Sequence, residues 1–232
     1  MSHEEASQRT MSHFALAALK DSYWMLDARA RAEVQQRWLA GLRDAAPSTY
    51  LYQLFGAESG ADVLIWSALP AGDPLAAHRF FECFARATNP VRAYVDIRTT
   101  LWGFTRPSQY SKAQRSAQEI DPFAQTRKPY LVMYPFTKTV EWYLLSRDSR
   151  QGMMNGHIKV GKQYEDISQL LLYSTGLQDQ EFVVVYETDD LARFSELVTE
   201  LRSSDARAYT LSDTPLHTAM YHPTDAALAL WA

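Results

Sequence analysis

The chain has 232 residues, 47% of them hydrophobic and 22% charged, and a formal net charge of −4. This length allows one large domain or two small ones, and the weakly acidic balance without a basic block argues against a nucleic-acid surface. A single cysteine, Cys83, excludes an intrachain disulfide, and no Cys/His cluster has zinc-ligand spacing. The first ten residues lack the features of a signal peptide, and no apolar run approaches membrane-spanning length. We therefore expect a cytoplasmic protein without a membrane span.

The first half of the chain predicts the order strand, helix, strand, strand, helix, strand. Apolar residues at helical spacing, such as Val34, Trp38 and Leu42, support the first helix. Gly56 marks the turn between the two middle strands. The expected strands cover residues 14–24, 50–55, 63–66 and about 93–102, and the expected helices cover roughly 27–44 and the sequence after 73.

The second half repeats this order. A helix after residue 188 is indicated by an apolar stripe that includes Leu191, Phe194 and Leu197, and either Thr188 or Asp189 is predicted to cap its N-terminus. A turn at Gly176 separates the middle strands. The expected strands cover residues 130–135, 170–173, 182–186 and 207–212, with helical sequence around 142–162.

This repeated order predicts an α+β fold made of two ferredoxin-like β-α-β-β-α-β repeats in one chain, which can pack as a barrel-like pair. We expect an N-terminal repeat at 1–110, a linker at 111–128 and a C-terminal repeat at 129–232. The polar stretch at 105–128 has little periodicity, and a connection of this length in a compact chain is often functional.

Three short runs in the second half carry a family resemblance. They are YPFTK at 134–138, MMNGHIKVG at 153–161 and STGLQDQEF at 174–182. In this order and at this spacing they resemble the chlorite dismutase family of haem proteins, which includes the coprohaem decarboxylases of bacterial haem synthesis. The resemblance in motifs extends from about residue 128 to 215, whereas the first half matches only in element order. The family fold is a pair of ferredoxin-like repeats.

The resemblance implies that His157 is the axial ligand of the iron in haem b or coprohaem. A neutral imidazole is a good donor to haem iron, and its other ring nitrogen needs an acceptor that orients the ring. Asp205 lies at about the position where family members place such a carboxylate, and ordinary solvation of this residue is the alternative. Met153 and Met154 are more simply explained by packing.

Gln169 lies where the resemblance places the residue on the distal side of the haem. Chlorite dismutases carry arginine there, whose fixed charge can hold an anionic substrate or intermediate above the iron. Gln169 carries no charge, and one branch of coprohaem decarboxylases has glutamine at this place. Leu170 competes for the assignment because the alignment needs a one-residue gap, and a polar strand-edge residue is the plain interpretation of Gln169.

Tyr134 and Lys138 match the Tyr-Pro-x-x-Lys run that supplies the catalytic tyrosine and a lysine near the reacting propionate in the decarboxylases. The implied roles are a phenoxyl relay at Tyr134 and carboxylate pairing with proton handling at Lys138. Phe136 and Thr137 depart from the methionine and serine that many decarboxylases carry. An amphipathic strand residue and a solvated charge are the plain alternatives.

Trp142 corresponds to an aromatic residue that lines the proximal side of the haem in the family, although an aromatic residue at helical spacing is more often part of a core. Arg106, Arg127 and Lys162 are candidates for binding the haem propionates, with surface solvation as the alternative. The resemblance also implies that the 105–128 segment borders the haem pocket.

The implied function is a haem-dependent oxidoreductase that uses hydrogen peroxide to convert two coprohaem propionates to the vinyl groups of protohaem. The alternatives are a chlorite dismutase, which splits chlorite to chloride and oxygen, and a haem carrier or sensor without turnover. Family members assemble as pentamers or, when shorter, as dimers, so we expect a homo-oligomer, a pentamer at this chain length.

Overall fold

The computed structural model describes residues 9–107, 110 and 118–232. The chain forms two compact units, and the first contains the described residues up to Thr105 together with Pro122–Thr126 and Thr218–Ala232. The second contains Arg127–His217 and the described part of Arg106–Asp121. This division differs from the expected one, because the end of the chain belongs to the first unit and the connecting segment is shared. Within the described ranges, no helix combines the length and apolarity needed to cross a membrane.

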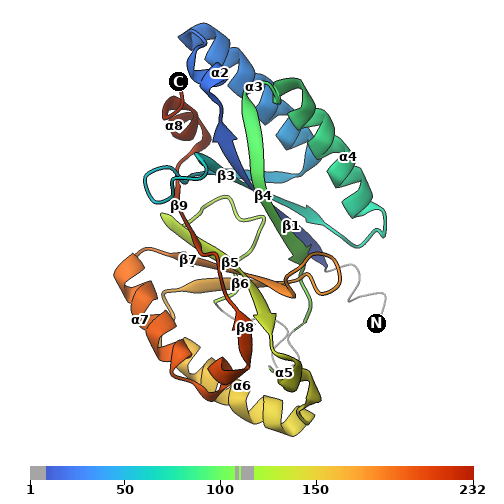
Figure 1. The fold of residues 1–232 in the computed structure, drawn as a ribbon, viewed down its shortest axis with the longest axis vertical. Coiled ribbons are helices and arrows are strands. Elements are labelled where there is room, and N and C mark those ends of the chain that lie inside the picture. Colours follow the sequence, from blue (N-terminus) through green and yellow to red (C-terminus); the bar gives the residue numbers. More distant parts are fainter. Residues whose placement is uncertain (1–8, 108–109, 111–117) are drawn as a thin grey trace. The chain divides into compact units, whose positions relative to one another are not determined.

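The first unit is an antiparallel sheet in the order β4–β1–β3–β2–β9 with its long helices on one face (Figure 1). Asp27 caps the first long helix by accepting a hydrogen bond from the Ala30 N–H. The elements are β1 (Thr10–Leu19), α2 (Asp21–Trp24), α3 (Ala28–Ala45), β2 (Ser48–Gln53), β3 (Val63–Pro70), α4 (Ala76–Thr88), the 3₁₀ helix η1 (Asn89–Val91), β4 (Val95–Phe104), β9 (His217–Tyr221) and α8 (Thr224–Ala229).

The second unit has its own antiparallel sheet, in the order β6–β7–β5–β8. Its elements are β5 (Tyr130–Lys138), α5 (Val140–Leu144), α6 (Arg147–Gly161), β6 (Ser168–Tyr173), β7 (Phe182–Thr188), α7 (Leu191–Arg202), the 3₁₀ helix η2 (Asp205–Tyr209) and β8 (Thr210–Ser212). In both units the first and third strands are central and the second and fourth flank them.

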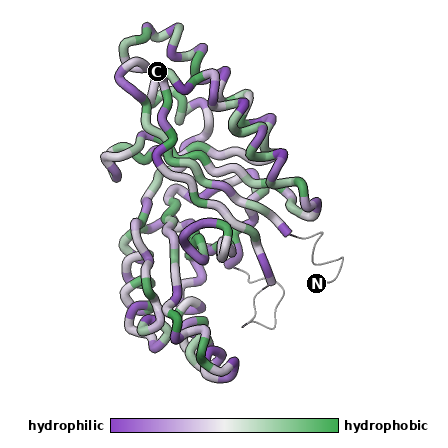
Figure 2. The backbone as a smooth tube through the Cα atoms, turned by 45° about the vertical axis from the view of Figure 1, so that its right-hand side comes forward, coloured by the Kyte–Doolittle hydropathy of each residue, from purple (hydrophilic) through white to green (hydrophobic). Residues whose placement is uncertain are grey.

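The two connections between the middle strands repeat the same local geometry. Gly56 and Gly176 adopt positive φ angles of 105° and 75°, where glycine is least strained. Isolated bridges join Phe55 to Glu58 in one turn and Thr175 to Gln178 in the other. Hydrophilic and hydrophobic segments alternate along the helices of both units (Figure 2). The predicted α+β class with two ferredoxin-like repeats is confirmed.

Several expected boundaries were wrong. The first strand ends at Leu19, and Trp24 belongs to the short helix α2. The helical sequence around 142–162 forms two helices, because Leu145 is extended and Ser146 caps α6 by accepting from the Ser149 N–H. Asp190 caps α7, one residue later than the latest expected cap. Residues 207–209 lie in η2, and β9 and α8 were not predicted.

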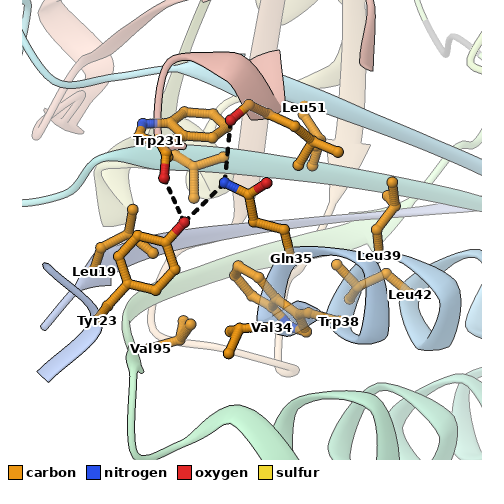
Figure 3. A pocket seen from close by; sticks show the side chains of 12 residues that line it. Leu19, Tyr23, Val34, Gln35, Trp38, Leu39, Leu42, Leu51, Val95 and Trp231 are labelled. Atoms are coloured by element: carbon orange, nitrogen blue, oxygen red, sulfur yellow. Dashed lines mark hydrogen bonds between the residues drawn. The ribbon is translucent and has the colours of Figure 1, made fainter. Parts of the chain in front are cut away.

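The first unit has a small apolar cavity that lies between the helices α3 and α8 and the sheet of this unit (Figure 3). Its volume is about 30 Å³, whereas sites for small-molecule ligands usually measure a few hundred Å³ or more. Tyr23 donates a hydrogen bond to the Trp231 carbonyl, and Gln35 donates to the Tyr23 hydroxyl and the Leu228 carbonyl. No histidine, cysteine or methionine lines this cavity. The cavity is therefore far too small for a porphyrin.

His13 makes the first unit sensitive to acid. It lies on β1, is 1% exposed and packs against Phe80, Phe81 and Phe84. Burial lowers its pKa from 6.5 to about 3, so the unfolded chain binds more protons than the folded chain between these values. The stabilisation present above pH 6.5 is therefore lost progressively as the pH falls toward 3.

We expect His13 alone to reduce the free energy of unfolding by about 3 kcal/mol between pH 7 and pH 4. Chemical denaturation of the wild type and of His13→Leu at both pH values checks this, since leucine fills the aromatic cluster without titrating. An equal acid loss in both proteins would contradict the role of His13.

Candidate functional site

One face of the second sheet is turned toward α6 and α7. Val132 and Tyr186 from this face pack in one core cluster with Tyr164, Phe194 and Leu197 from the helical side. Cross-strand register places the residues of this helix-facing side in three rows: Val132, Tyr134 and Phe136 on β5, Tyr186, Val184 and Phe182 on β7, and Gln169, Leu171 and Tyr173 on β6.

The helix-facing side is covered unevenly. On the opposite side of the sheet, Leu131, Met133, Leu170 and Leu172 are all at most 3% exposed. On the helix-facing side, Gln169 is exposed and the apolar side chain of Leu171 is 42% exposed. The β6 row thus presents an accessible, largely apolar surface beside the more deeply packed β5 and β7 rows.

His157 lies on α6 at the border of this region. No residue of α6 is fully buried, and Met153, Met154, His157 and Ile158 form a half-buried stripe at helical spacing. The His157 Nδ1 atom is buried without a hydrogen-bond partner among the described residues. Burial, and then the positive charge of Lys138, lower the pKa of His157, which favours a neutral imidazole with a free lone pair.

Lys138 ends β5 and lies close to Trp142. Its ammonium nitrogen is 4.2 Å from the centroid of the Trp142 ring and donates a hydrogen bond to the Ala206 carbonyl at 3.4 Å. Burial lowers the pKa of Lys138 to about 8; the charge of Glu181 opposes this shift and that of Arg207 contributes to it. Trp142, on α5, is 4% exposed. The structure thus brings His157, Lys138 and Trp142 into one neighbourhood.

Tyr134 is paired with a second tyrosine. Its ring stacks on that of Tyr186 with centroids 6.3 Å apart and an interplanar angle of 27°. Burial raises the pKa of Tyr134 well above its usual range, and Tyr186 acts in the same direction. The phenol is therefore protonated across the physiological range. Tyr186 pairs with Gln169 across the β6–β7 ladder. On the helix-facing side, Tyr186 therefore lies on the strand between β5, which carries Tyr134, and β6, which carries Gln169.

Gln169, rather than Leu170, belongs to the helix-facing side. Successive strand residues point to opposite faces, and Leu170 is 3% exposed on the other side of the sheet. The backbone of Gln169 pairs with the connecting segment: its N–H donates to the Gln118 carbonyl at 2.7 Å, and its carbonyl accepts from the Ile120 N–H at 3.0 Å.

The three cationic candidates have different surroundings. The Arg106 guanidinium lies 4.9 Å from the centroid of the Tyr173 ring, so it borders the helix-facing side. Arg127 is 1% exposed and pairs with Glu187 at 3.4 Å, which commits it to a buried ion pair. Lys162 follows α6 directly and is exposed. Of the three, Arg106 therefore lies beside the candidate site, whereas the charge of Arg127 is already paired with a buried carboxylate.

Asp205 was considered as the acceptor for His157 Nδ1, and the structure does not join them. Asp205 is the exposed first residue of η2, while Nδ1 has no acceptor among the described residues.

The expected pocket-bordering loop lies partly outside the described residues, at 108–109 and 111–117. Its described residue Tyr110 stacks edge-on against Trp142 at 6.5 Å, and its carbonyl accepts a hydrogen bond from Gln151 on α6.

Sequence reasoning missed Tyr186 and Gln118. Tyr186 read as one more apolar residue of a strand, and its pairing with Tyr134 depends on the register of β5 against β7. That register becomes readable only when the strand order is known. Gln118 lies in a polar segment whose sequence has no periodicity that would indicate its contacts.

Comparison with known proteins gives a consistent result. The sequence profile of the family described as chlorite dismutase matches residues 20–222. The chain is 30% identical over 173 residues to the coprohaem decarboxylase of Mycolicibacterium smegmatis, covering 72% of this chain and 70% of that one. It is 30% identical over 159 residues to the coprohaem decarboxylase of Staphylococcus saprophyticus, covering 64% and 63%. A mutant chlorite dismutase from Candidatus Nitrospira defluvii has a similar structure, with a TM-score of 0.82, 21% identity and coverage of 96% and 95%.

Proposed function

Because the chain belongs to the chlorite dismutase family, we propose that it binds an iron porphyrin, haem b or coprohaem, through His157 and decarboxylates coprohaem to protohaem. The two relatives named above are coprohaem decarboxylases, and this supports the proposed reaction. The observation that carries the proposal is the gathering of a neutral histidine, a protonated tyrosine, a partly buried lysine and an uncharged glutamine on one side of the second sheet.

The residues present fit an iron porphyrin. An axial ligand must offer an unprotonated ring nitrogen, and burial together with Lys138 favours that state of His157. A planar, largely apolar ring needs an apolar surface, which the exposed side chain of Leu171 and the ring of Tyr173 present on the helix-facing side of the sheet. Trp142 adds an aromatic wall close to Lys138.

The proposed reaction balances with hydrogen peroxide as oxidant. Each propionate carboxylate leaves as carbon dioxide, and its side chain loses the equivalent of a hydride to become a vinyl group. This hydride equivalent consists of one proton and two electrons. One peroxide molecule takes them up together with one further proton from solution and is converted to two water molecules. The bound iron supplies the redox chemistry that activates the peroxide. Two propionates therefore consume two peroxide molecules.

Each residue has a role that follows from its environment. Tyr134 is held protonated and stacked, so its phenol can give up an electron and its proton together rather than titrate on its own. Lys138 can pair with a substrate carboxylate, and a pKa of about 8 lets it exchange a proton near neutral pH. Gln169 offers hydrogen bonds without adding a fixed charge.

Titration of the purified protein with iron coproporphyrin III tests the binding part of this proposal. We expect one porphyrin per chain and the absorption spectrum of a histidine-ligated ferric iron. We also propose a homo-oligomer, a pentamer by family resemblance, which sedimentation of the loaded protein measures. Absence of binding would contradict the proposed function as a whole.

Chlorite dismutation is the alternative reaction, and Gln169 argues against it. The amide cannot hold an anion above the iron as a guanidinium does. We expect the loaded wild type to release oxygen from chlorite slowly and Gln169→Arg to release it at least about 10-fold faster, since a charged hydrogen bond is worth more than about 1.4 kcal/mol. An oxygen electrode measures both rates. Fast release by the wild type would favour the alternative, and tight binding without any turnover would favour a haem carrier.

A further inference from the structure

Side chains from other segments hold the connection between α6 and β6: those of Lys128, Arg193 and Gln118 all donate hydrogen bonds to its backbone carbonyls. The Gln118 Nε2 atom lies within hydrogen-bond distance of three carbonyl oxygens: those of Gly161 at 3.3 Å, Tyr164 at 2.8 Å and Ile167 at 3.2 Å. Gly161 is the last residue of α6, and Ile167 directly precedes β6. The Gly161 and Tyr164 carbonyls also accept from the Tyr164 and Ile167 N–H groups, so the amide adds a further hydrogen bond from another segment to these carbonyls.

The backbone of the same segment reaches the next strand. The Gln169 N–H donates to the Gln118 carbonyl, and the Ile120 N–H donates to the Gln169 carbonyl. Glu119 and Gln169 form the corresponding isolated parallel bridge. A single residue, Gln118, therefore binds the end of α6 through its side chain and Gln169 through its backbone.

The two ends of this link coincide with the two sides of the candidate site. His157 lies one turn before Gly161 on α6, and Gln169 lies on the helix-facing side of β6. We propose that Gln118 is a positioning residue that fixes the distance between His157 and Gln169 and so sets the space in which the porphyrin and its distal ligand lie. This inference rests on the proposed function, since it assumes that both residues face the same porphyrin.

The isosteric substitution Gln118→Glu separates shape from hydrogen bonding. Glutamate keeps the volume of the side chain, but an ionised carboxylate has no hydrogen to donate. It would face three carbonyl oxygens, one of them at the negative end of α6, where an added negative charge is unfavourable. We expect α6 and the connection to move away from Gln118 and the spacing between His157 and Gln169 to change.

A matched control lies in the first unit. The Gln53 side chain, at the end of β2, donates to the backbone carbonyl of Phe55 at 3.0 Å and also hydrogen-bonds His222 at 3.0 Å. Gln53→Ala therefore removes side-chain hydrogen bonds of a glutamine without touching α6 or β6. Gln118→Ala, which removes the donor without adding a charge, keeps the test valid if the glutamate variant does not fold.

The experiment measures ferric coproporphyrin affinity, the absorption spectrum of the complex and the affinity of the complex for imidazole, in the wild type and the three variants. We expect the Gln118 variants to bind the porphyrin about 10-fold more weakly, as loss of an outer-sphere contact commonly does, with altered spectra and imidazole affinity. Gln53→Ala should match the wild type in all three. Wild-type values in both Gln118 variants would overturn the positioning role alone, whereas a wild type that binds no porphyrin would overturn the proposed function on which it rests.

Discussion

Tyr134→Phe is expected to bind coprohaem with the affinity of the wild type and to lose formation of protohaem. The substitution removes only a hydroxyl group, and the ring stack on Tyr186 at 6.3 Å should persist. Without the O–H bond the side chain has no proton to release with its electron, so we expect product formation to fall by about 100-fold or more. Single-turnover reactions with hydrogen peroxide, followed by mass spectrometry of the porphyrin, measure this rate.

Tyr173→Phe is the matched control for this prediction. Tyr173 lies on the same side of the sheet, is half-buried and contacts Arg106, but it is not stacked on Tyr186. Its hydroxyl should be dispensable for decarboxylation. Undiminished turnover in Tyr134→Phe, or an equal loss in both variants, would contradict a specific role for Tyr134.

His157→Ala is expected to weaken binding of iron coproporphyrin by about 100-fold. Loss of an outer-sphere partner alone commonly weakens metal binding by roughly 10–100-fold, and this variant loses the ligand itself. The iron-free porphyrin should bind equally to the wild type and the variant, because it makes no bond to the imidazole. Parallel titrations with the iron and iron-free porphyrins therefore isolate the contribution of the axial bond.

Met154→Leu tests the neighbouring donor on the same half-buried stripe of α6. We expect it to bind iron coproporphyrin like the wild type, since leucine preserves the packing and the sulfur is not a ligand. Added imidazole should restore the spectrum of His157→Ala by filling the space that the side chain leaves. A loss of iron binding in Met154→Leu with full binding in His157→Ala would reverse the assignment.

The site residues that the sequence predicted lie in contiguous motifs. Tyr134 and Lys138 lie on one strand and Trp142 follows in the next helix, so their neighbourhood depends mainly on local structure. His157 lies on one further element, the helix α6. Gln169 on β6 was predicted from the spacing between the His157 motif and the Ser-Thr-Gly turn. The choice between Gln169 and Leu170 needed the structure, because a shift of one residue reverses the face of a strand.

Other features depend on contacts between distant segments and left no pattern in the sequence. Arg127 was a candidate for binding a haem propionate, with surface solvation as the alternative, and its side chain is buried against Glu187, sixty positions away in the chain. The end of the chain read as part of the second repeat, yet Leu228 and Trp231 pack in the core of the first unit against Tyr23. Neither hydrophobic periodicity nor turn residues carry information about such partners.

Stepwise addition of hydrogen peroxide to the wild-type protein loaded with iron coproporphyrin III, followed by mass spectrometry of the porphyrin, tests the proposed decarboxylation directly. We expect two successive losses that each correspond to one carbon dioxide and one hydride equivalent, with protohaem as the final product and about two peroxide molecules consumed per porphyrin. Bleaching of a tightly bound coprohaem without either loss would contradict the proposed decarboxylation.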